Sequence, residues 1–576
     1  MATNLSIPVT CGADAFVALL AHNRSDCLFL NSGTDTFPIQ ESLTRFESEG
    51  QGAPRVVTCP DELVAISAAH GHYLVSRRPQ TVLVHVDAGT MQLGGGLHNA
   101  QRARAGMVLC AGKSPLTLEG ELPGSRNLWI HWIQDQPDQA MGVRGYCKWV
   151  YDLQRNESIH HVVTRAFQIA GAEPAGPTYM TLAREVLMEN LKEVHLPADR
   201  LEPPALPCAA ASSLRPVAEA LAHARSPLIL TGYAGRNPKT VPELVRLAEL
   251  TGAPVVSATA SCLNFPNTHP LWGGISPNPY LEKADIILVI DCDVPYIPSD
   301  VSPQKDARIL WMDVDPLKSN IPLFTFPADV RIQADSATAL PVLTDCVEEL
   351  LRPKDREAHQ KRAAQLKKKH THRRQEWRDA ALEKSSEQPI APEWLMYCIN
   401  QALDQDTIVL DETVTNLRFS ATMLERTQPS TWFTSGGASL GWALGAGVGV
   451  RLAAPDRTVV ALVGDGTFMF GCPTAALWTA AAHNAPFLTI ILNNQMHFAT
   501  KRSWLMHYPK GHGRHLDRFV GTDLQPSPDF AHIANACHAY GKTVICPEEL
   551  PDAIQRGLEA VRGGQAAVLD VRIQRP

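Results

Sequence analysis

The sequence lacks a long apolar run. No uninterrupted apolar segment among its 576 residues reaches the length of about 18 residues that a transmembrane helix needs. The nearest candidate, ASLGWALGAGVGV, is rich in glycine and ends at Arg451. The N-terminal stretch MATNLSIPVTCGADAF has no basic start followed by an apolar core, so it has no features of a signal peptide. We therefore expect a cytoplasmic protein that does not contact a membrane.

Excess positive charge and paired cysteines are also missing. The formal net charge is −7, whereas proteins that bind nucleic acids in general are usually basic. The 13 cysteines include no C-x-x-C pair, and their odd number argues against a disulfide framework. These features predict a protein of a reducing compartment, without a nucleic-acid partner.

What the sequence does contain is a regular alternation of strand-like and helix-like segments. Near-continuous apolar runs such as TVLVHVD, DIILVID, VVALVGD and FLTIILNN are typical of parallel strands that are buried on both faces. Their alternation with helical segments predicts an α/β protein with doubly wound parallel sheets. Because the chain is too long for one hydrophobic core, it favours about two to four domains.

Two segments have the composition of linkers. Residues 196–216 are rich in Pro, Ala and Ser, and residues 352–379 are highly charged, as in a solvated helix. They predict three domains, at residues 1–190, 205–350 and 375–576.

Two polar motifs follow apolar strands in the last of these domains. Gly464-Asp465-Gly466 ends one run, and an asparagine pair that finishes at Asn494 ends the next, with 26 residues between the motifs. Glycine permits a tight turn and a close approach of the backbone to a ligand. Because parallel strands end at the same edge of a sheet, Asp465 and Asn494 can converge there. Their side-chain oxygens and the carbonyl of Met496 would suit Mg²⁺, with diphosphate oxygens and water completing an octahedron.

Familiar nucleotide-binding motifs do not account for these glycines. A Rossmann fingerprint needs a third glycine where Met469 stands, and the stretch GMVLCAGKS has one residue too many for a Walker A loop. An ordinary turn between a strand and a helix is the alternative that the motif alone leaves open.

With two further stretches, the motif resembles the signature of enzymes that depend on thiamine diphosphate (ThDP). The segment TSGGASLGWALGAGVGVRLAAPDRTVVALVGDG is similar to the one that carries the diphosphate-binding motif in acetolactate synthase and benzoylformate decarboxylase. CPDELVAISAAHGHY is similar to the N-terminal element with the family's glutamate, and VHVDAGTMQLGGGLHNAQRARAG is similar to the stretch that follows it. The resemblance covers most of the chain.

The resemblance implies three α/β domains: an N-terminal one that binds the aminopyrimidine ring, a central one, and a C-terminal one that binds the diphosphate. The site would lie between two subunits, so we expect a homodimer or homotetramer. Glu62 matches the glutamate that hydrogen-bonds the pyrimidine and so promotes deprotonation of the thiazolium ring, which is the cofactor's own chemistry. An acid in the first turn of a helix is the alternative for this residue.

The resemblance also implies contacts to the cofactor from the C-terminal domain. Leu440 matches the bulky residue that holds ThDP in a bent form, and the Ala438 carbonyl matches the acceptor of its amino group. Glu412 and Thr415 match a loop that touches the diphosphate, and Thr467 offers a hydroxyl and an amide to phosphate. The whole expected cofactor site comprises Glu62, Glu412, Thr415, Ala438, Leu440, Gly464, Asp465, Gly466, Thr467, Asn494 and Met496; its metal ligands are Asp465, Asn494 and Met496.

Two residues are candidates for the substrate side. His85 follows Glu62 by 23 residues, which matches an active-site histidine of benzoylformate decarboxylase that acetolactate synthases generally lack. Histidine can shuttle protons near neutral pH. Thr34 matches a serine near the substrate in the same decarboxylase, and its hydroxyl can bind a carboxylate. A structural histidine at a strand end and a threonine in a turn remain open alternatives.

The sequence departs from several members of the family. VIDCDVPYIPSD lacks the second histidine of benzoylformate decarboxylase, and Thr500 stands where pyruvate decarboxylases have a glutamate. A plain pyruvate decarboxylase is therefore not expected. The central domain has no arginine-rich stretch of the kind that binds FAD in acetolactate synthases, so FAD is not expected either.

These features predict a ThDP- and Mg²⁺-dependent lyase or transferase that acts on a small 2-oxo acid. Loss of CO₂ would leave an enamine, which a decarboxylase protonates to an aldehyde and a carboligase of the acetolactate synthase type adds to an aldehyde or ketone. Cleavage of a 2-hydroxyacyl-CoA or of an acyloin is one alternative. A non-catalytic, regulatory relative that only binds ThDP is the alternative of another class.

Overall fold

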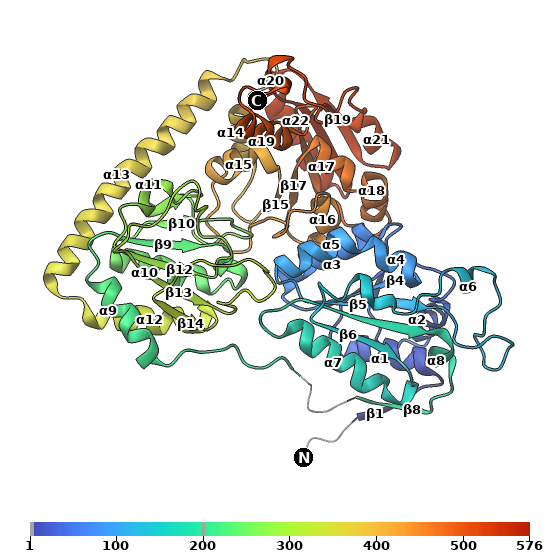
Figure 1. Ribbon diagram of the computed structural model, residues 1–576. Coiled ribbons are helices and arrows are strands. Elements are labelled where there is room, and N and C mark those ends of the chain that lie inside the picture. Colours follow the sequence, from blue (N-terminus) through green and yellow to red (C-terminus); the bar gives the residue numbers. More distant parts are fainter. Residues whose placement is uncertain (1–4, 197–201, 576) are drawn as a thin grey trace.

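Most of the strands form three separate six-stranded sheets in the computed structural model, which describes residues 5–196 and 202–575. Strand pairing within each of the three is parallel throughout. Each sheet lies in one of three α/β parts of the molecule (Figure 1). The predicted fold class, an α/β protein with three parallel sheets, is confirmed.

The N-terminal sheet has the strand order β3-β2-β4-β5-β7-β6. Along β4, Val82 and Val84 pack into one hydrophobic core and Leu83 into another, so both faces of the sheet are covered. The strands are β2 (Cys27–Leu30), β3 (Arg55–Thr58), β4 (Gln80–Val84), β5 (Met107–Lys113), β6 (Trp149–Leu153) and β7 (Pro177–Ala183). The helices are α1 (Gly12–His22), α2 (Phe37–Ser48), α3 (Glu62–Ser76), α4 (Val86–Gln92), α5 (Gly94–Arg102), α6 (Ile130–Ile133), α7 (Ile159–Gly171) and α8 (Arg184–Met188). β1 (Leu5–Pro8) pairs with β8 (Glu193–Leu196) in a separate antiparallel ribbon.

The central sheet has the order β11-β10-β9-β12-β13-β14. Its strands are β9 (Pro227–Thr231), β10 (Val255–Ser257), β11 (Trp272–Gly274), β12 (Ile286–Ile290), β13 (Arg308–Asp313) and β14 (Val330–Gln333). Its helices are α9 (Ala211–Ala222), α10 (Thr240–Thr251), α11 (Asn278–Leu281) and α12 (Ser336–Leu350).

The C-terminal sheet has the order β16-β15-β17-β18-β20-β19. Its strands are β15 (Ile408–Glu412), β16 (Trp432–Phe433), β17 (Val459–Gly464), β18 (Leu488–Asn493), β19 (Tyr540–Val544) and β20 (Ala567–Arg572). The helices are α14 (Pro392–Ala402), α15 (Leu417–Met423), α16 (Trp442–Ala453), α17 (Asp465–Phe470), α18 (Pro473–Ala482), α19 (Phe498–His507), α20 (His512–His515), α21 (Phe530–Ala536) and α22 (Leu550–Arg562).

The N-terminal and C-terminal domains share one hydrophobic core, which runs through helices α3 and α16 (Figure 1). The two helices approach closely because small residues line their contact. A Cβ added to Gly449 would lie 1.8 Å from the Ala68 carbonyl oxygen, and one added to Gly71 would lie 2.3 Å from the Ala446 carbonyl oxygen. These glycines let the backbones meet, and the contact fixes the start of α3 relative to the C-terminal domain.

The charged segment predicted as a solvated helix forms the 31-residue helix α13 (Pro353–Glu383), which runs from the central to the C-terminal domain (Figure 1). Most of its side chains are exposed, and His370 is an exception. His370 is buried and its Nε2 lies 3.1 Å from the Asn267 carbonyl oxygen, because this part of α13 packs against the central domain.

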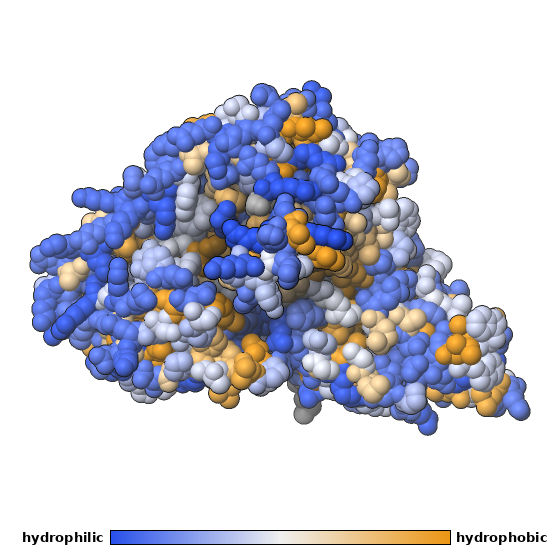
Figure 2. All heavy atoms as spheres, turned by 45° about the horizontal axis from the view of Figure 1, so that its top comes forward, coloured by the Kyte–Doolittle hydropathy of each residue, from blue (hydrophilic) through white to orange (hydrophobic). Residues whose placement is uncertain are grey.

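Hydrophilic side chains dominate the face shown in Figure 2, and apolar side chains appear there in smaller areas. Within residues 5–196 and 202–575, no helix combines the length and the apolar content needed to cross a bilayer. The residue ranges proposed for the three domains stay predictions.

Candidate functional site

The two polar motifs of the C-terminal domain meet at one edge of its sheet. Gly464 of β17 is paired with Leu492 of the neighbouring parallel strand β18, so Asp465 and Asn494 follow strands that end side by side. Both residues line a pocket of about 530 Å³ at this edge. The same pocket gathers most of the predicted cofactor contacts, namely Thr415, Leu440, Gly464, Asp465, Gly466, Thr467, Asn494 and Met496.

Asp465 is buried in this pocket with half of its carboxylate unpaired. Its Oδ1 accepts a hydrogen bond of 2.9 Å from the Gly466 amide. Its Oδ2 is buried and has no hydrogen-bond partner among the described residues. Burial raises the pKa of this carboxyl group, and the backbone amides of Gly466 and Gln495 oppose that shift. An unpaired buried carboxylate oxygen is costly unless a cation binds it.

Asn494 and Met496 form a tight turn beside this carboxylate. The Asn494 side-chain oxygen accepts a hydrogen bond of 3.0 Å from the Met496 amide, which holds the side chain in place. An amide oxygen has a second lone pair that remains available to a ligand. Gly466 is needed here, since a Cβ at this position would lie 2.6 Å from Cε1 of the His497 ring.

A second and larger pocket adjoins the first. It has a volume of about 1210 Å³ and is lined by Glu412, Ala438 and Leu440, with further walls from the central domain. Leu440 and Val414 line both pockets. Val414 has a φ of 53°, a strained conformation for a β-branched residue of the kind that clusters at binding sites.

Glu412 has a structural partner that the sequence did not reveal. Its carboxylate accepts hydrogen bonds from the amides of Gly441 (3.0 Å), Trp442 (3.2 Å) and Ala443 (2.8 Å), which are the first free amides of α16. Burial raises its pKa to about 7, and these amides oppose the shift. Glu412 therefore caps α16 and fixes the turn that carries Leu440.

Glu62 is the first residue of α3. The preceding Asp61 caps the helix, because its carboxylate accepts hydrogen bonds from the Leu63 and Val64 amides. Glu62 is left free of this task, and its side chain is buried. Burial raises the pKa of the Glu62 carboxyl, while a hydrogen bond with Asn31 and the charge of His85 oppose the shift.

His85 forms a short hydrogen-bonded pair with Asp35 through Nδ1 and Oδ1. This hydrogen bond raises the pKa of His85, and burial opposes the shift. Two glycines leave the room for the pair: a Cβ at Gly33 would lie 2.1 Å from Nδ1 of His85, and one at Gly112 would lie 1.4 Å from Oδ2 of Asp35. Thr34 is exposed beside this pair, and its carbonyl accepts a hydrogen bond from Arg184.

Asp35 is a functional candidate that the sequence did not single out. It stands in a turn, where aspartate is common for other reasons, and only the fold brings it to His85. In contrast with the C-terminal residues, Glu62, His85 and Thr34 do not line either of the two pockets described above. The structure thus forms two clusters of predicted site residues, one in each terminal domain.

Comparison with known proteins identifies the family. The models of thiamine pyrophosphate enzymes match this chain with their N-terminal TPP-binding domain at residues 10–141, their central domain at 214–343 and their C-terminal TPP-binding domain at 413–571. Thiamine pyrophosphate is another name for ThDP. The chain therefore belongs to the family of ThDP-dependent enzymes.

Its relatives include two kinds of enzyme. Benzoylformate decarboxylase of Pseudomonas aeruginosa is 25% identical over 519 residues, which cover 87% of this chain and 89% of the relative. The large subunit of acetolactate synthase isozyme 3 of Escherichia coli is 24% identical, over 73% of this chain and 72% of the relative. Among solved structures, the ThDP-dependent 4-hydroxybenzoylformate decarboxylase of Rhodococcus jostii RHA1 has the same fold, with a TM-score of 0.79 and 21% identity over 98% of this chain and 99% of that one.

Proposed function

We propose that this protein is a ThDP- and Mg²⁺-dependent enzyme that removes CO₂ from a small 2-oxo acid. The observation that carries the proposal is the buried, unpaired Oδ2 of Asp465, in the same pocket as Asn494. The described residues contain no group of three or more His, Cys, Asp or Glu side chains that could bind a metal without help. A cation at Asp465 would need oxygen atoms from its ligand, which fits a diphosphate.

The residues around this pocket fit the cofactor. Asp465, Asn494 and the carbonyl of Met496 would hold Mg²⁺, while Thr467 and Thr415 would bind the diphosphate. Leu440 and the carbonyl of Ala438 would position the rings, supported by the helix cap at Glu412. When bound, ThDP supplies a nucleophilic carbon that adds to the substrate carbonyl and accepts the electrons of the broken C–C bond.

Glu62 would hold the proton that controls the cofactor's pyrimidine ring. Burial favours the neutral carboxyl group, so Glu62 can donate a hydrogen bond to a ring nitrogen at a pH where an exposed glutamate is ionised. Asp61 takes over the capping of α3 and leaves the Glu62 carboxyl to this role.

His85 would move a proton to or from the substrate. Its hydrogen bond to Asp35 stabilises the charged imidazolium, which can give up a proton from Nε2 to a reacting carbon or oxygen. The pair favours decarboxylation, which ends with such a proton transfer, over addition to a second carbonyl compound. Thr34 stays a candidate for binding the substrate carboxylate.

A complete site would need two copies of the chain. Glu62 and His85 do not line the pockets of the C-terminal domain, so we propose that they face the pockets of a partner subunit in a homodimer or homotetramer. Large apolar side chains near α4 and α6 are exposed and available for such an interface, namely Met91 (64%), Trp129 (74%), Ile133 (70%) and Met141 (75%).

The test is CO₂ release from a panel of 2-oxo acids, with pyruvate, 2-oxobutyrate, branched and aromatic members, in the presence and absence of ThDP and Mg²⁺. Release that requires both supports the proposal, and analysis of the products separates aldehydes from acyloins. An aldehyde identifies a decarboxylase, whereas an acyloin or an acetolactate identifies a carboligase.

Absence of CO₂ release from every member would overturn the proposed reaction. Assays with acyloins and 2-hydroxyacyl-CoA compounds would then test the alternative of a lyase. Tight ThDP binding without any turnover would support a non-catalytic relative.

A further inference from the structure

The larger of the two pockets that Leu440 lines extends well beyond the residues predicted to contact ThDP. Glu412, Ala438 and Leu440 belong to the predicted cofactor site, but most of the lining does not. The other walls come from the central domain and from a separate part of the C-terminal domain, and they include Thr259, Ala260, Ile275, Leu417, Ala421 and Trp432. This part of the pocket is open to the compound that reacts with the cofactor.

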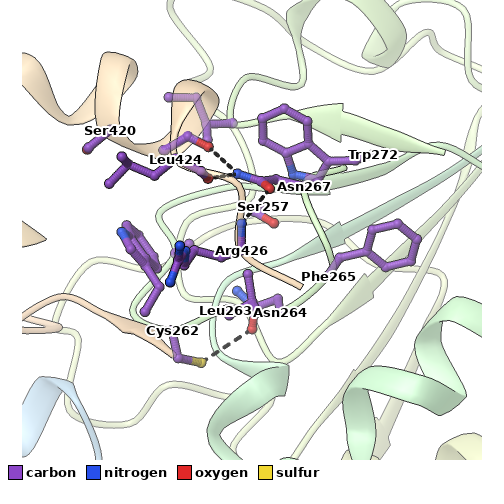
Figure 3. A pocket seen from close by; sticks show the side chains of 14 residues that line it. Ser257, Cys262, Leu263, Asn264, Phe265, Asn267, Trp272, Ser420, Leu424 and Arg426 are labelled. Carbon is purple, nitrogen blue, oxygen red and sulfur yellow. Dashed lines mark hydrogen bonds between the residues drawn. The ribbon is translucent and has the colours of Figure 1, made fainter. Parts of the chain in front are cut away.

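The lining residues show how this pocket is oriented. Val414 and Leu440 line both this pocket and the pocket of Asp465, so they mark its near end. Ile275, Ala421 and Trp432 line both this pocket and a narrow apolar space between the central and C-terminal domains (Figure 3). That space shares no lining residue with the pocket of Asp465. Ile275, Ala421 and Trp432 therefore mark the far end.

The pocket offers no free charge among the described residues that line it. Its only ionisable side chains are those of Asp411 and Glu412, and Glu412 caps α16. Oδ1 of Asp411 accepts hydrogen bonds from the amide (3.1 Å) and the hydroxyl (2.8 Å) of Thr413. Its Oδ2 accepts one from the Ser420 hydroxyl and one of 3.3 Å from Nε1 of Trp432. A charged group on a ligand would lose its hydration here without gaining a partner.

Most hydroxyl groups along the pocket are engaged as well. The hydroxyls of Thr259, Thr434 and Ser435 each donate to a main-chain carbonyl, at 3.4, 3.3 and 3.1 Å. Ligand sites are typically apolar with a few placed polar groups. Here the polar groups gather at the cofactor end, and the far end offers mainly hydrocarbon.

The far wall is held in place by the central domain. The side-chain amide of Asn267 donates hydrogen bonds to the carbonyl oxygens of Ala421 (3.1 Å) and Leu424 (2.5 Å). Its oxygen accepts one of 3.0 Å from the Arg426 amide (Figure 3). Because the end of α15 is anchored in this way, a ligand would lose little binding energy to ordering the wall.

We propose, in an inference that rests on the proposed function, that this pocket binds the side chain of the 2-oxo acid and selects apolar side chains longer than a methyl group. The carboxylate and the keto group lie at the near end, where the cofactor reacts, and the side chain extends toward Ile275 and Ala421. These two residues set the length that fits. Pyruvate leaves the far end unfilled, and 2-oxoglutarate brings a carboxylate to it that finds no partner.

The first experiment measures kcat/KM for CO₂ release from pyruvate, 2-oxobutyrate, 2-oxopentanoate and 2-oxohexanoate with ThDP and Mg²⁺. Each methylene group that becomes buried should raise kcat/KM by about fourfold. 2-Oxoglutarate and 5-methyl-2-oxohexanoate form a matched pair, because a carboxylate and an isopropyl group have nearly the same shape. The charged member should have a kcat/KM lower by at least about tenfold.

Two substitutions at the far wall locate the effect. Ala421→Leu fills the far end and should lower kcat/KM for 2-oxohexanoate by at least about tenfold, while pyruvate keeps its value within about twofold. Ile275→Ala opens the same end and should shift the preference to a longer chain such as 2-oxooctanoate. Ile545→Ala is the matched control and should leave the chain-length profile unchanged, because Ile545 is 59% exposed and lines neither pocket.

Two kinetic results would overturn the proposal. One is a kcat/KM that is highest for pyruvate, or equal for 2-oxoglutarate and 5-methyl-2-oxohexanoate. The other is that both far-wall variants change pyruvate and 2-oxohexanoate by the same factor, which would place the side chain elsewhere. Since Ile275→Ala and Ala421→Leu change the space in opposite directions, either one decides the question where the other does not fold.

Saturated carboxylates separate a failure of this inference from a failure of the proposed reaction, because they have no 2-oxo group and cannot lose CO₂ in the same way. Calorimetry on the protein with ThDP and Mg²⁺ compares hexanoate with butyrate. If no 2-oxo acid releases CO₂ but hexanoate binds at least about tenfold more tightly, and Ala421→Leu removes this difference, the reaction is wrong and the pocket assignment holds. Equal binding of hexanoate and butyrate would overturn the pocket assignment.

Discussion

At the scale of single residues, the proposed role of Glu62 can be tested directly by a conservative substitution. Glu62→Gln keeps the volume and the helix start but removes the titratable proton. If the Glu62 carboxyl controls the cofactor, kcat/KM on the preferred 2-oxo acid should fall by about 10²–10⁴. The melting temperature and ThDP affinity should change little, because Asp61 rather than Glu62 caps α3. Undiminished turnover by this variant would remove Glu62 from the proposed site.

The pair of His85 and Asp35 makes a prediction about pH. Asp35 raises the pKa of His85, so Asp35→Asn should lower it. The limb of the pH–activity profile that belongs to His85 should then move to lower pH in the variant. A profile that stays in place, with only a uniform loss of rate, would show that Asp35 does not act through His85.

The same pair has a consequence for stability. Because the pKa of His85 is raised in the folded state, the pair stabilises the fold below the pKa of an unfolded histidine, and this contribution is lost as the pH rises through the folded pKa. Asp35→Asn should therefore lower the melting temperature more in mild acid than in alkali. Melting curves at several pH values measure this difference.

Asp465 is predicted to bind ThDP through a metal ion. Asp465→Asn replaces one carboxylate oxygen by an NH₂ group, which cannot coordinate a cation. In Mg²⁺ the affinity for ThDP, measured by calorimetry, should fall by about tenfold or more. With the metal removed by a chelator, the variant and the parent should bind ThDP alike. An equal loss in both conditions would mean that Asp465 acts without a metal.

At the scale of elements, the contact of α3 with α16 depends on glycine. Gly449→Ala places a methyl group 1.8 Å from the Ala68 carbonyl oxygen, which forces the two helices apart. We expect a loss of about 1–3 kcal/mol in the free energy of unfolding. Gly94→Ala is the matched control, because Gly94 also lies in a helix and a Cβ there meets no atom within 4 Å. Thermal or denaturant unfolding compares the two; equal stability would contradict the packing argument.

Elements buried on both faces were predictable from their composition, and short edge elements were not. β17 and β18 are continuous apolar runs, so their position and parallel pairing could be inferred from the sequence. β16 has only two residues, and its pairing depends on β15 and on a loop of the central domain that lies far away in the chain. α17 and α18 are two separate helices, because Cys472 adopts a left-handed conformation with φ 47° between them.

The residues of the candidate site likewise differ in whether the sequence could predict their roles. The convergence of Asp465 and Asn494 was predictable, since it needs only the rule that parallel strands end at one edge. The capping role of Glu412 was not, because its partners lie about 30 residues later and are backbone amides without a sequence signal. The role of Asp35 was not predictable for a similar reason. Asp35 lies in the turn after β2 and His85 directly follows β4, so only the pairing of these strands in the sheet brings the two side chains together.

At the scale of the whole molecule, the division of the predicted site between two terminal domains has a direct consequence. The pockets around Asp465 are lined by the predicted contacts of the C-terminal domain, and Glu62 and His85 do not line them. If these two residues come from a second subunit, each site in a dimer joins Glu62 of one chain to Asp465 of the other. Such an arrangement can be tested with two variants that are each inactive.

Mixing Glu62→Gln with Asp465→Ala distinguishes the arrangements. In a mixed dimer with sites between subunits, one site receives both lesions and the other receives none. After unfolding and joint refolding of equal amounts, about half of the dimers are mixed, so about a quarter of the parental activity should return. If every site were built within one chain, each would carry a lesion and no activity would return. Each variant refolded alone is the control, and size-exclusion chromatography confirms that the recovered activity elutes with an oligomer.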